Sequence, residues 1–239
     1  MSDPTKPPPP PPPWSGASPP PPPPLGAAPP PQSTGAAGTG SRGLRVASIV
    51  LFWCTAASAV ITVLAVAGRR SVWSDFVDGG LEFEDLQRID DADAFVSAGF
   101  GLLLILGLAT LIVVSIWSLR VGRRARLTGA TDVSPGLACG SWYIPYASAI
   151  VPFIQLRRMA RHWRRPTAML GVWQGFYIAS WVVGTGLFGL EPNEDDVFAD
   201  VSDVTDQLTT QFAFAVLLMI AMLVMAFAAM QAVRSLDDS

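Results

Sequence analysis

Charged residues are scarce in this chain. Of its 239 residues, 15% are charged and half are hydrophobic, whereas soluble globular proteins carry about 25% charged residues. The composition therefore excludes an ordinary soluble domain. Cysteine is nearly absent as well. Cys54 and Cys139 lie far apart, each inside an apolar stretch, so the sequence predicts neither a disulfide framework nor a metal site built on paired cysteines.

The chain also lacks the groups that catalysis requires. His162 is its single histidine and stands among arginines, where nothing in the sequence orients it as a general base. A His-Glu-x-x-His pair, a P-loop and a Gly-x-Ser-x-Gly elbow are all missing from the sequence. We therefore expect no enzyme, no cofactor, no metal site and no nucleic-acid partner.

Proline is concentrated at the N-terminus. Seventeen of the 22 prolines lie in the first 31 residues, with unbroken runs at 7–13 and 19–24. Such runs adopt extended polyproline II and bury no core, which predicts a disordered proline-rich cytoplasmic tail over residues 1–45. The tail is either a docking strip for a cytoplasmic protein partner or a passive low-complexity spacer. Composition does not separate the two.

Four apolar segments are long enough to cross a bilayer, whose hydrocarbon core of about 30 Å needs about 20 residues of helix. None has Asp, Glu, Lys, Arg or His in its interior. Because lipid satisfies no backbone hydrogen bond, each segment is predicted to be a helix. The chain is therefore predicted to be an all-α integral membrane protein with a helical membrane domain over 46–234. Its predicted spans are Val46–Ala67, Phe95–Leu119, Ala168–Leu190 and Phe212–Val233.

The charges that flank these spans are segregated by sign. Four arginines lie at 120–126, after the second span, and five lie at 157–165, before the third. By contrast, residues 71–94 and 191–211 are rich in carboxylates. Short loops that are rich in arginine stay in the cytoplasm. This rule predicts a multi-pass protein of the cell membrane with both termini in the cytoplasm.

Residues 136–165 interrupt this pattern. Their first part is apolar enough to resemble another span, but Pro145 and Pro152 each remove a helical hydrogen bond. A full crossing would also place the two arginine groups on opposite sides of the membrane, against the charge rule. We therefore predict a proline-broken re-entrant or interfacial segment, with a fifth true span as the alternative.

After Pro152 the sequence has the pattern of an amphipathic helix. The apolar residues recur at helical spacing on one face and are Phe153, Leu156, Met159, Ala160 and Trp163. The opposite face is basic and holds Arg157, Arg158, Arg161, His162, Arg164 and Arg165. A short helix of this kind is typical of the headgroup plane, where arginines bind anionic lipid. The alternative is a plain cytoplasmic connector whose arginines enforce topology.

A short pattern surrounds the two internal prolines. The letters WYIPYASAIVP contain Trp142, Pro145 and Pro152, and the basic amphipathic helix follows them. This arrangement resembles the signature of an actinobacterial membrane family, domain of unknown function 4328, over roughly Val46–Val233. The resemblance implies a proline- and glycine-rich N-terminus, about four spans and a Trp-x-x-Pro…Pro element before the last two. It implies no activity.

Two functions are compatible with these features. The preferred prediction is a non-catalytic interaction or scaffold protein, which presents the polyproline tail and the basic helix on the cytoplasmic face. The alternative is a small-solute channel or transporter built around Trp142–Pro152, because unwound backbone in membranes often lines a binding site. The candidate residues for interfaces are Trp142, Pro145, Pro152, Arg157, Arg158, Arg161, Trp163, Arg164 and Arg165.

Overall fold

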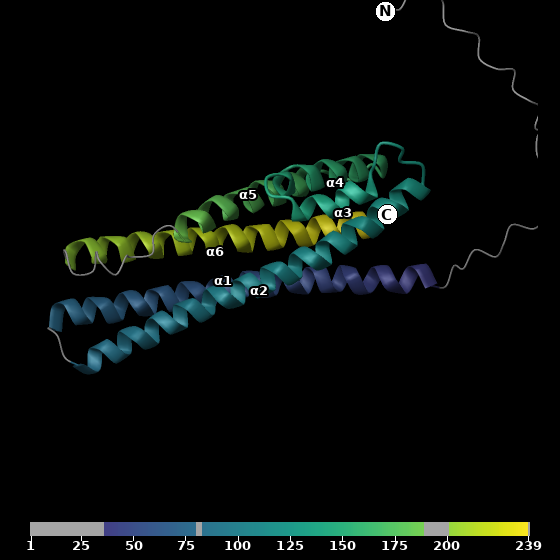
Figure 1. Cartoon of the computed structure of the whole chain (residues 1–239). Coiled ribbons are helices and arrows are strands. Elements are labelled where there is room, and N and C mark those ends of the chain that lie inside the picture. The colour runs from purple at the N-terminus through teal and green to yellow at the C-terminus, as the bar shows by residue number, and fades with distance from the viewer. Residues whose placement is uncertain (1–35, 80–82, 189–200, 239) are drawn as a thin grey trace, which may run out of the picture. The chain divides into compact units, whose positions relative to one another are not determined.

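The computed structural model describes residues 36–79, 83–188 and 201–238, and its regular elements there are all helices (Figure 1). Two short 3₁₀ turns, Ser141–Tyr143 and Ala147–Ala149, separate α3 from α4. Most of the predicted proline-rich tail, residues 1–35, lies outside the described residues. The α-helices are α1 (Ala36–Gly79), α2 (Phe83–Leu127), α3 (Pro135–Gly140), α4 (Val151–His162), α5 (Ala168–Phe188) and α6 (Val201–Asp237).

Within the described residues, three helices are long and apolar enough to cross a membrane, namely α1, α2 and α6. They contain the first, second and fourth predicted spans, which are confirmed to that extent. Their 44, 45 and 37 residues correspond to about 66, 68 and 55 Å of helix, much more than the roughly 30 Å of a bilayer core. The excess arises because each helix continues past its apolar span into the charged sequence beside it.

α5 coincides with the third predicted span. It has 21 residues, none of them charged, and a length of about 31 Å. Its apolar stretch has a lower hydropathy than those of the three long helices, because Gln174, Tyr177 and four glycines interrupt it. One of these glycines, Gly186, lies against α6, where an added Cβ would meet the Phe214 ring at 2.8 Å.

The long helices pack closely around α1. α1 contacts both α2 and α6, and α5 contacts α6. Thr55 and Thr110 join α1 to α2 through hydroxyl oxygens that lie 2.9 Å apart. A Cβ on Gly99 would stand 3.3 Å from the Thr62 hydroxyl oxygen. Small and hydroxyl-bearing residues allow this close approach of membrane helices.

The start of α1 and the ends of α2, α4 and α6 meet at one end of the bundle, which we call the basic end. Arg45 forms ion pairs with Asp237 and Asp238, and Arg124 donates to the Asp237 carbonyl at 3.2 Å. Arg165, just after α4, donates to the Asp238 carbonyl at 2.9 Å. The basic end comprises the twelve arginines at 42, 45, 120–126, 157–165 and 234, together with Asp132, Asp237 and Asp238.

The opposite end, where α1 is followed by α2 and where α6 begins, is the acidic end. Arg69 of α1 pairs there with Asp93 of α2 at 2.5 Å and donates to Gln211 of α6 at 3.3 Å. These contacts tie three helices together at the border of the carboxylate-rich sequence. The two ends of the bundle therefore differ in the sign of their charge.

The segment between α2 and α5 is a hairpin, which we call the broken hairpin (residues 130–165). Just beyond α2, Gly129 has a left-handed φ of 101°, and the Ala130 amide donates to the Ala125 carbonyl at 2.9 Å, as in a Schellman cap. At the far end of the hairpin, His162 Nε2 lies 3.1 Å from Thr128 Oγ1. The hairpin therefore begins and ends beside the same end of α2.

Candidate functional site

The tip of the broken hairpin contains a strained turn. The Ala147 amide donates to the Pro145 carbonyl at 2.7 Å across Tyr146. Tyr146 has φ 63° and ψ −42°, which is close to the rare γ-turn with positive φ. A non-glycine residue in such a conformation is held there by its surroundings. Pro145 is exposed, while Pro152 is buried in the first turn of α4, where a missing N–H is tolerated.

Five rings from four parts of the chain meet beneath this turn, and we call them the aromatic cluster. Trp142 stacks on Trp173 of α5 at 6.0 Å and meets Phe153 and Tyr177 edge-on at 5.5 and 5.9 Å. Phe52 of α1 contacts Trp173 at 5.4 Å. Ring pairs at such distances contribute about 0.5–1.5 kcal/mol each beyond burial. Trp142 therefore fastens the broken hairpin to the membrane helices.

Side chains satisfy the backbone where the hairpin is not helical. Gln155, 3% exposed, accepts from the Ser134 amide at 2.9 Å. Ser118 of α2 donates to the Ala138 carbonyl at 2.7 Å. Because the protein interior offers no water, buried backbone amides and carbonyls need such partners.

A second polar link joins the hairpin to α5. Gln174 donates to the Ala149 carbonyl at 2.9 Å and accepts from Arg157 Nη2 at 2.7 Å. Arg157 is half-buried and faces α5, where an added Cβ on Gly171 would lie 3.7 Å from its guanidinium. Gln174 thus couples a charged group of α4 to the unwound turn before it.

The apolar face of α4 is buried in protein. Phe153, Leu156 and Met159 are all 0% exposed, and Trp163 packs at the edge of the same core. The predicted division of α4 into two faces is present, and protein covers its apolar face; its place at the headgroups stays a prediction. α4 runs along the bundle from the aromatic cluster to the basic end (Figure 1). Phe153 contacts the Trp173 ring of α5 at 5.3 Å, and Met159 lies against Gly122 of α2.

The remaining predicted arginines divide into two groups. Arg158 donates to the Asp132 carbonyl at 2.7 Å, and Arg165 caps the C-terminus of α6. Arg161 and Arg164 are exposed. Arg164 has a left-handed φ of 55°, and the amide after it donates to the Ala160 carbonyl at 2.7 Å, which ends α4 before Pro166.

Gly122 allows the hairpin to lie on α2. An added Cβ there would stand 3.0 Å from Met159 Cε and 3.1 Å from the Pro135 Cα. The Pro135 contact is with backbone, which cannot rotate away. A side chain at 122 would therefore push the hairpin off α2.

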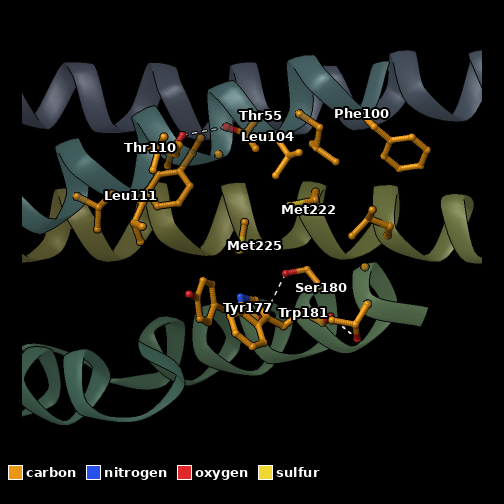
Figure 2. Close-up of a pocket in the computed structure, with 18 of the residues that line it drawn as sticks. Thr55, Phe100, Leu104, Thr110, Leu111, Tyr177, Ser180, Trp181, Met222 and Met225 are labelled. Atoms are coloured by element: carbon orange, nitrogen blue, oxygen red, sulfur yellow. Dashed lines mark hydrogen bonds between the residues drawn. The ribbon is translucent and has the colours of Figure 1, made fainter. Parts of the chain in front are cut away.

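An apolar groove of about 460 Å³ lies between α2 and α5, and we call it the groove (Figure 2). Leu104 and Leu111 of α2 form one wall, and Tyr177 and Trp181 of α5 form the other. Met222 and Met225 of α6 lie between the two walls. Trp142 of the broken hairpin also lines it, with 4% of its surface exposed.

The hydroxyls of the groove are already bonded. The Thr55 and Thr110 hydroxyls lie 2.8 and 2.7 Å from the Leu51 and Leu106 carbonyls and 2.9 Å from each other, so one hydroxyl donates to a carbonyl of its own helix and the other donates to that hydroxyl. Ser180 donates to the Tyr177 carbonyl at 2.8 Å. Since each hydroxyl has a single proton to donate, the walls offer a ligand mainly hydrocarbon surface.

Several residues of this site were not among the predicted ones. Trp173, Gln155 and Gly122 come from three separate elements, and no local spacing relates them to Trp142. For Gln174 the sequence does predict a contact, because an amide inside a predicted span needs a hydrogen-bond partner in the protein. Such an amide indicates a buried contact but does not identify its partner.

Comparison with known proteins gives one match. The family model described as Domain of unknown function (DUF4328) matches residues 81–238, more than half of the chain. The match includes the broken hairpin and α5, but it begins after α1, later than the predicted start at Val46. It carries no source organism, so the actinobacterial origin stays a prediction. No curated protein and no solved structure matches the chain.

Proposed function

This chain belongs to the DUF4328 family, and from that premise we propose that it is a non-catalytic protein of the cell membrane that presents a basic interaction surface to the cytoplasm. The surface is the basic end, joined by the proline-rich tail that precedes α1. Its partners are anionic lipid headgroups and a cytoplasmic protein that binds polyproline. Four helices, α1, α2, α5 and α6, cross the bilayer, and both termini are cytoplasmic.

The contact of Thr128 with His162 at 3.1 Å carries this proposal. Because the broken hairpin begins and ends at one place, the arginines in the last turns of α2 and those of α4 stand at the same end. Arginine-rich ends remain in the cytoplasm. The hairpin then re-enters the membrane. Its Tyr143 hydroxyl lies 2.6 Å from Ser115 Oγ, and Ser115 precedes Arg120 by about 8 Å of helix.

Several charges of the basic end remain available to anions, although Arg45 is paired with Asp237 and Asp238. Arg126, Arg158 and Arg165 donate to backbone carbonyls, which are dipoles without net charge. These contacts hold the side chains in place without neutralising them. Arginine near an anionic leaflet contributes about 1 kcal/mol of binding per residue, so exposed Arg161 and Arg164 add to a surface suited to such lipid.

A channel or transporter for polar solutes receives less support. Such a protein needs polar groups along its path, and ionisable groups in spans usually mark it. The groove beside Trp142 has mainly hydrocarbon walls, and its threonine and serine hydroxyls have hydrogen-bond partners within the protein. The broken hairpin therefore lies next to an apolar space, which suits apolar ligands better than hydrated ones.

Cysteine labelling tests the orientation. Thr167→Cys at the basic end and Ser74→Cys at the acidic end are made singly in a Cys54→Ser, Cys139→Ser background. An impermeant maleimide should label position 74 in intact cells and position 167 only after the cells are opened. Labelling of position 167 in intact cells would overturn the cytoplasmic basic surface.

The tail is tested separately. Residues 1–35 are replaced by a glycine- and serine-rich sequence of equal length, which removes polyproline and leaves α1 intact. We expect this replacement to remove one of the proteins that co-purify with the native protein from membranes. A synthetic peptide of residues 1–35 should bind the protein that was lost. An unchanged set of co-purifying proteins would contradict a docking role for the tail.

A further inference from the structure

The end of α6 is held by arginines from three other parts of the chain, and we call this contact the clasp. Arg45 of α1 forms ion pairs with the carboxylates of Asp237, at 3.7 Å, and of Asp238. Arg124 of α2 donates to the Asp237 carbonyl at 3.2 Å, and Arg165, which follows α4, donates to the Asp238 carbonyl at 2.9 Å. Two consecutive aspartates thus join four parts of the chain.

The Asp238 carboxylate is the group of the clasp that another anion can replace. The Asp238 side chain is 58% exposed and that of Arg45 is 27% exposed, whereas that of Asp237 is only 8% exposed. Leu236, one residue earlier, belongs to the core. An anion can therefore reach Arg45 and displace Asp238 while the rest of α6 stays packed.

The clasp lies close to the ends of the predicted spans. Arg45 immediately precedes the first span, Arg165 precedes the third by three residues, and Asp238 follows the fourth by five residues. At 1.5 Å per residue these positions lie within about 8 Å of the hydrocarbon core. The polar layer on each side of that core is about 5–8 Å thick. Lipid phosphates therefore lie at the depth of the clasp.

The ion pair of the clasp is weak enough for lipid to compete with it. A partly exposed ion pair gains little free energy, because water solvates both charges when the pair opens. An arginine at an anionic membrane surface gains a comparable free energy from the headgroups, and a phosphate accepts two parallel hydrogen bonds from one guanidinium. Lipid composition can therefore shift the balance between the closed and the open clasp.

We infer that the clasp is an autoinhibitory contact, in which Asp238 occupies Arg45 in place of the phosphate of an anionic lipid. When such lipid is abundant, its phosphate binds Arg45 and the Asp238 carboxylate leaves. Arg165 then loses its contact with the Asp238 carbonyl, so a second arginine becomes available to headgroups. The inference deepens the proposed function and rests on it, because it requires the basic end to lie among headgroups.

Hydrogen exchange of the full-length protein tests the inference. The Asp238 amide donates to the Arg234 carbonyl at 3.2 Å, so its exchange rate reports opening of the clasp. The protein is placed in three samples at equal ionic strength. These are nanodiscs of phosphatidylcholine, the same nanodiscs with inorganic phosphate, and nanodiscs of phosphatidylcholine and phosphatidylglycerol in equal parts.

We expect exchange to be about fivefold faster with phosphatidylglycerol alone, which corresponds to about 1 kcal/mol, the contribution of one arginine at an anionic surface. Equal exchange in the three samples, or slower exchange with phosphatidylglycerol, would overturn the inference. Equally fast exchange with inorganic phosphate would show that a soluble anion opens the clasp, which would overturn the assignment to lipid.

Asp238→Asn tests the inhibition itself, because it removes the carboxylate and keeps the backbone. Each variant is compared with itself in the two lipid mixtures, and Asp238→Asn should respond little to phosphatidylglycerol. In native mass spectrometry it should retain about fivefold more phosphatidylglycerol than the native protein. Asp132→Asn is the matched control, because Asp132 is exposed at the same end and contacts Arg158 through its carbonyl. Equal lipid retention by the native protein and Asp238→Asn would contradict autoinhibition.

Arg45→Gln tests the other partner of the ion pair. It should abolish the response to phosphatidylglycerol, because both the closed and the lipid-bound state use this guanidinium. Arg42→Gln removes an exposed arginine one turn earlier in α1 and should leave the response in place. A full response in Arg45→Gln would contradict the assignment of the phosphate to Arg45.

The labelling of position 167 separates this inference from the proposed function. An internal position 167, together with exchange that ignores phosphatidylglycerol, refutes the autoinhibitory clasp and leaves the cytoplasmic basic surface intact. Labelling of position 167 in intact cells refutes that surface. The nanodisc experiment still reports the clasp in that case, because both faces of a nanodisc carry the same lipid.

Discussion

Both ends of the bundle contain an arginine paired with aspartate, Arg45 at the basic end and Arg69 at the acidic end, but the basic end also uses arginine in a second way. At the acidic end, Arg69 is paired with the Asp93 carboxylate and with Gln211, so the contact fastens helices and is electrically neutral. At the basic end, Arg158 and Arg165 donate to backbone carbonyls, so they fasten helix ends while the charge persists. The same residue type can therefore stabilise packing at one end and keep the other strongly positive.

The largest loss of stability is expected in the aromatic cluster, which holds the broken hairpin against the bundle. Trp142→Ala removes three ring contacts and should destabilise the protein by about 3–5 kcal/mol, because a truncated buried aromatic leaves a cavity. Trp73→Ala at the acidic end, where the indole contacts Phe76 at 5.7 Å, should cost much less. Thermal unfolding in detergent measures the stability of both variants. Equal losses of stability for the two tryptophans would contradict this difference between the ends.

A smaller effect is expected at the contact between α2 and the broken hairpin. Gly122→Val should destabilise by about 1–3 kcal/mol, since its side chain must displace the Pro135 backbone. Gly101→Val places the same side chain in open space on the same helix and serves as the control. If both variants unfolded at the same temperature, the hairpin would not rest on Gly122.

The smallest effects compare single arginines. Arg69→Gln should cost about 1 kcal/mol, because it leaves the half-exposed Asp93 without its ion pair, and Arg165→Gln should cost about 0.5 kcal/mol. High salt should reduce the difference in stability loss between the two variants, because it screens the ion pair of Arg69. Unfolding temperatures at low and high salt measure this. A larger loss for Arg165→Gln would reverse the comparison.

The sequence predicts well whatever depends on local pattern. Unbroken apolar runs identified the cores of α1, α2 and α6, and the spacing from Phe153 to Trp163 identified the buried face of α4. The same spacing cannot say what covers that face, because bilayer and protein interiors are equally apolar. The sequence therefore identified the apolar face of α4 but not the residues of α2 and α5 that cover it.

The aromatic cluster and the groove were beyond sequence prediction. The cluster joins Phe52 to Trp142 and Trp173, and no periodicity connects residues so far apart in the chain. The groove is the space between α2 and α5. Its existence depends on how each of these helices packs against its neighbours, which a sequence pattern does not reveal. Gly122 likewise has no signal in a single sequence, because its role depends on the approach of Pro135 and Met159.

Cross-linking of the hairpin's two ends tests the central claim most directly. Thr128→Cys and His162→Cys are introduced together in the Cys54→Ser, Cys139→Ser background, and native membranes are treated with a short bismaleimide. The account predicts joined peptides by mass spectrometry, because the two side chains are in contact, whereas Thr128→Cys with Ser74→Cys should give none. If positions 128 and 162 each react with a monofunctional maleimide but never join, the segment crosses the roughly 30 Å bilayer core, and the cytoplasmic basic surface is refuted.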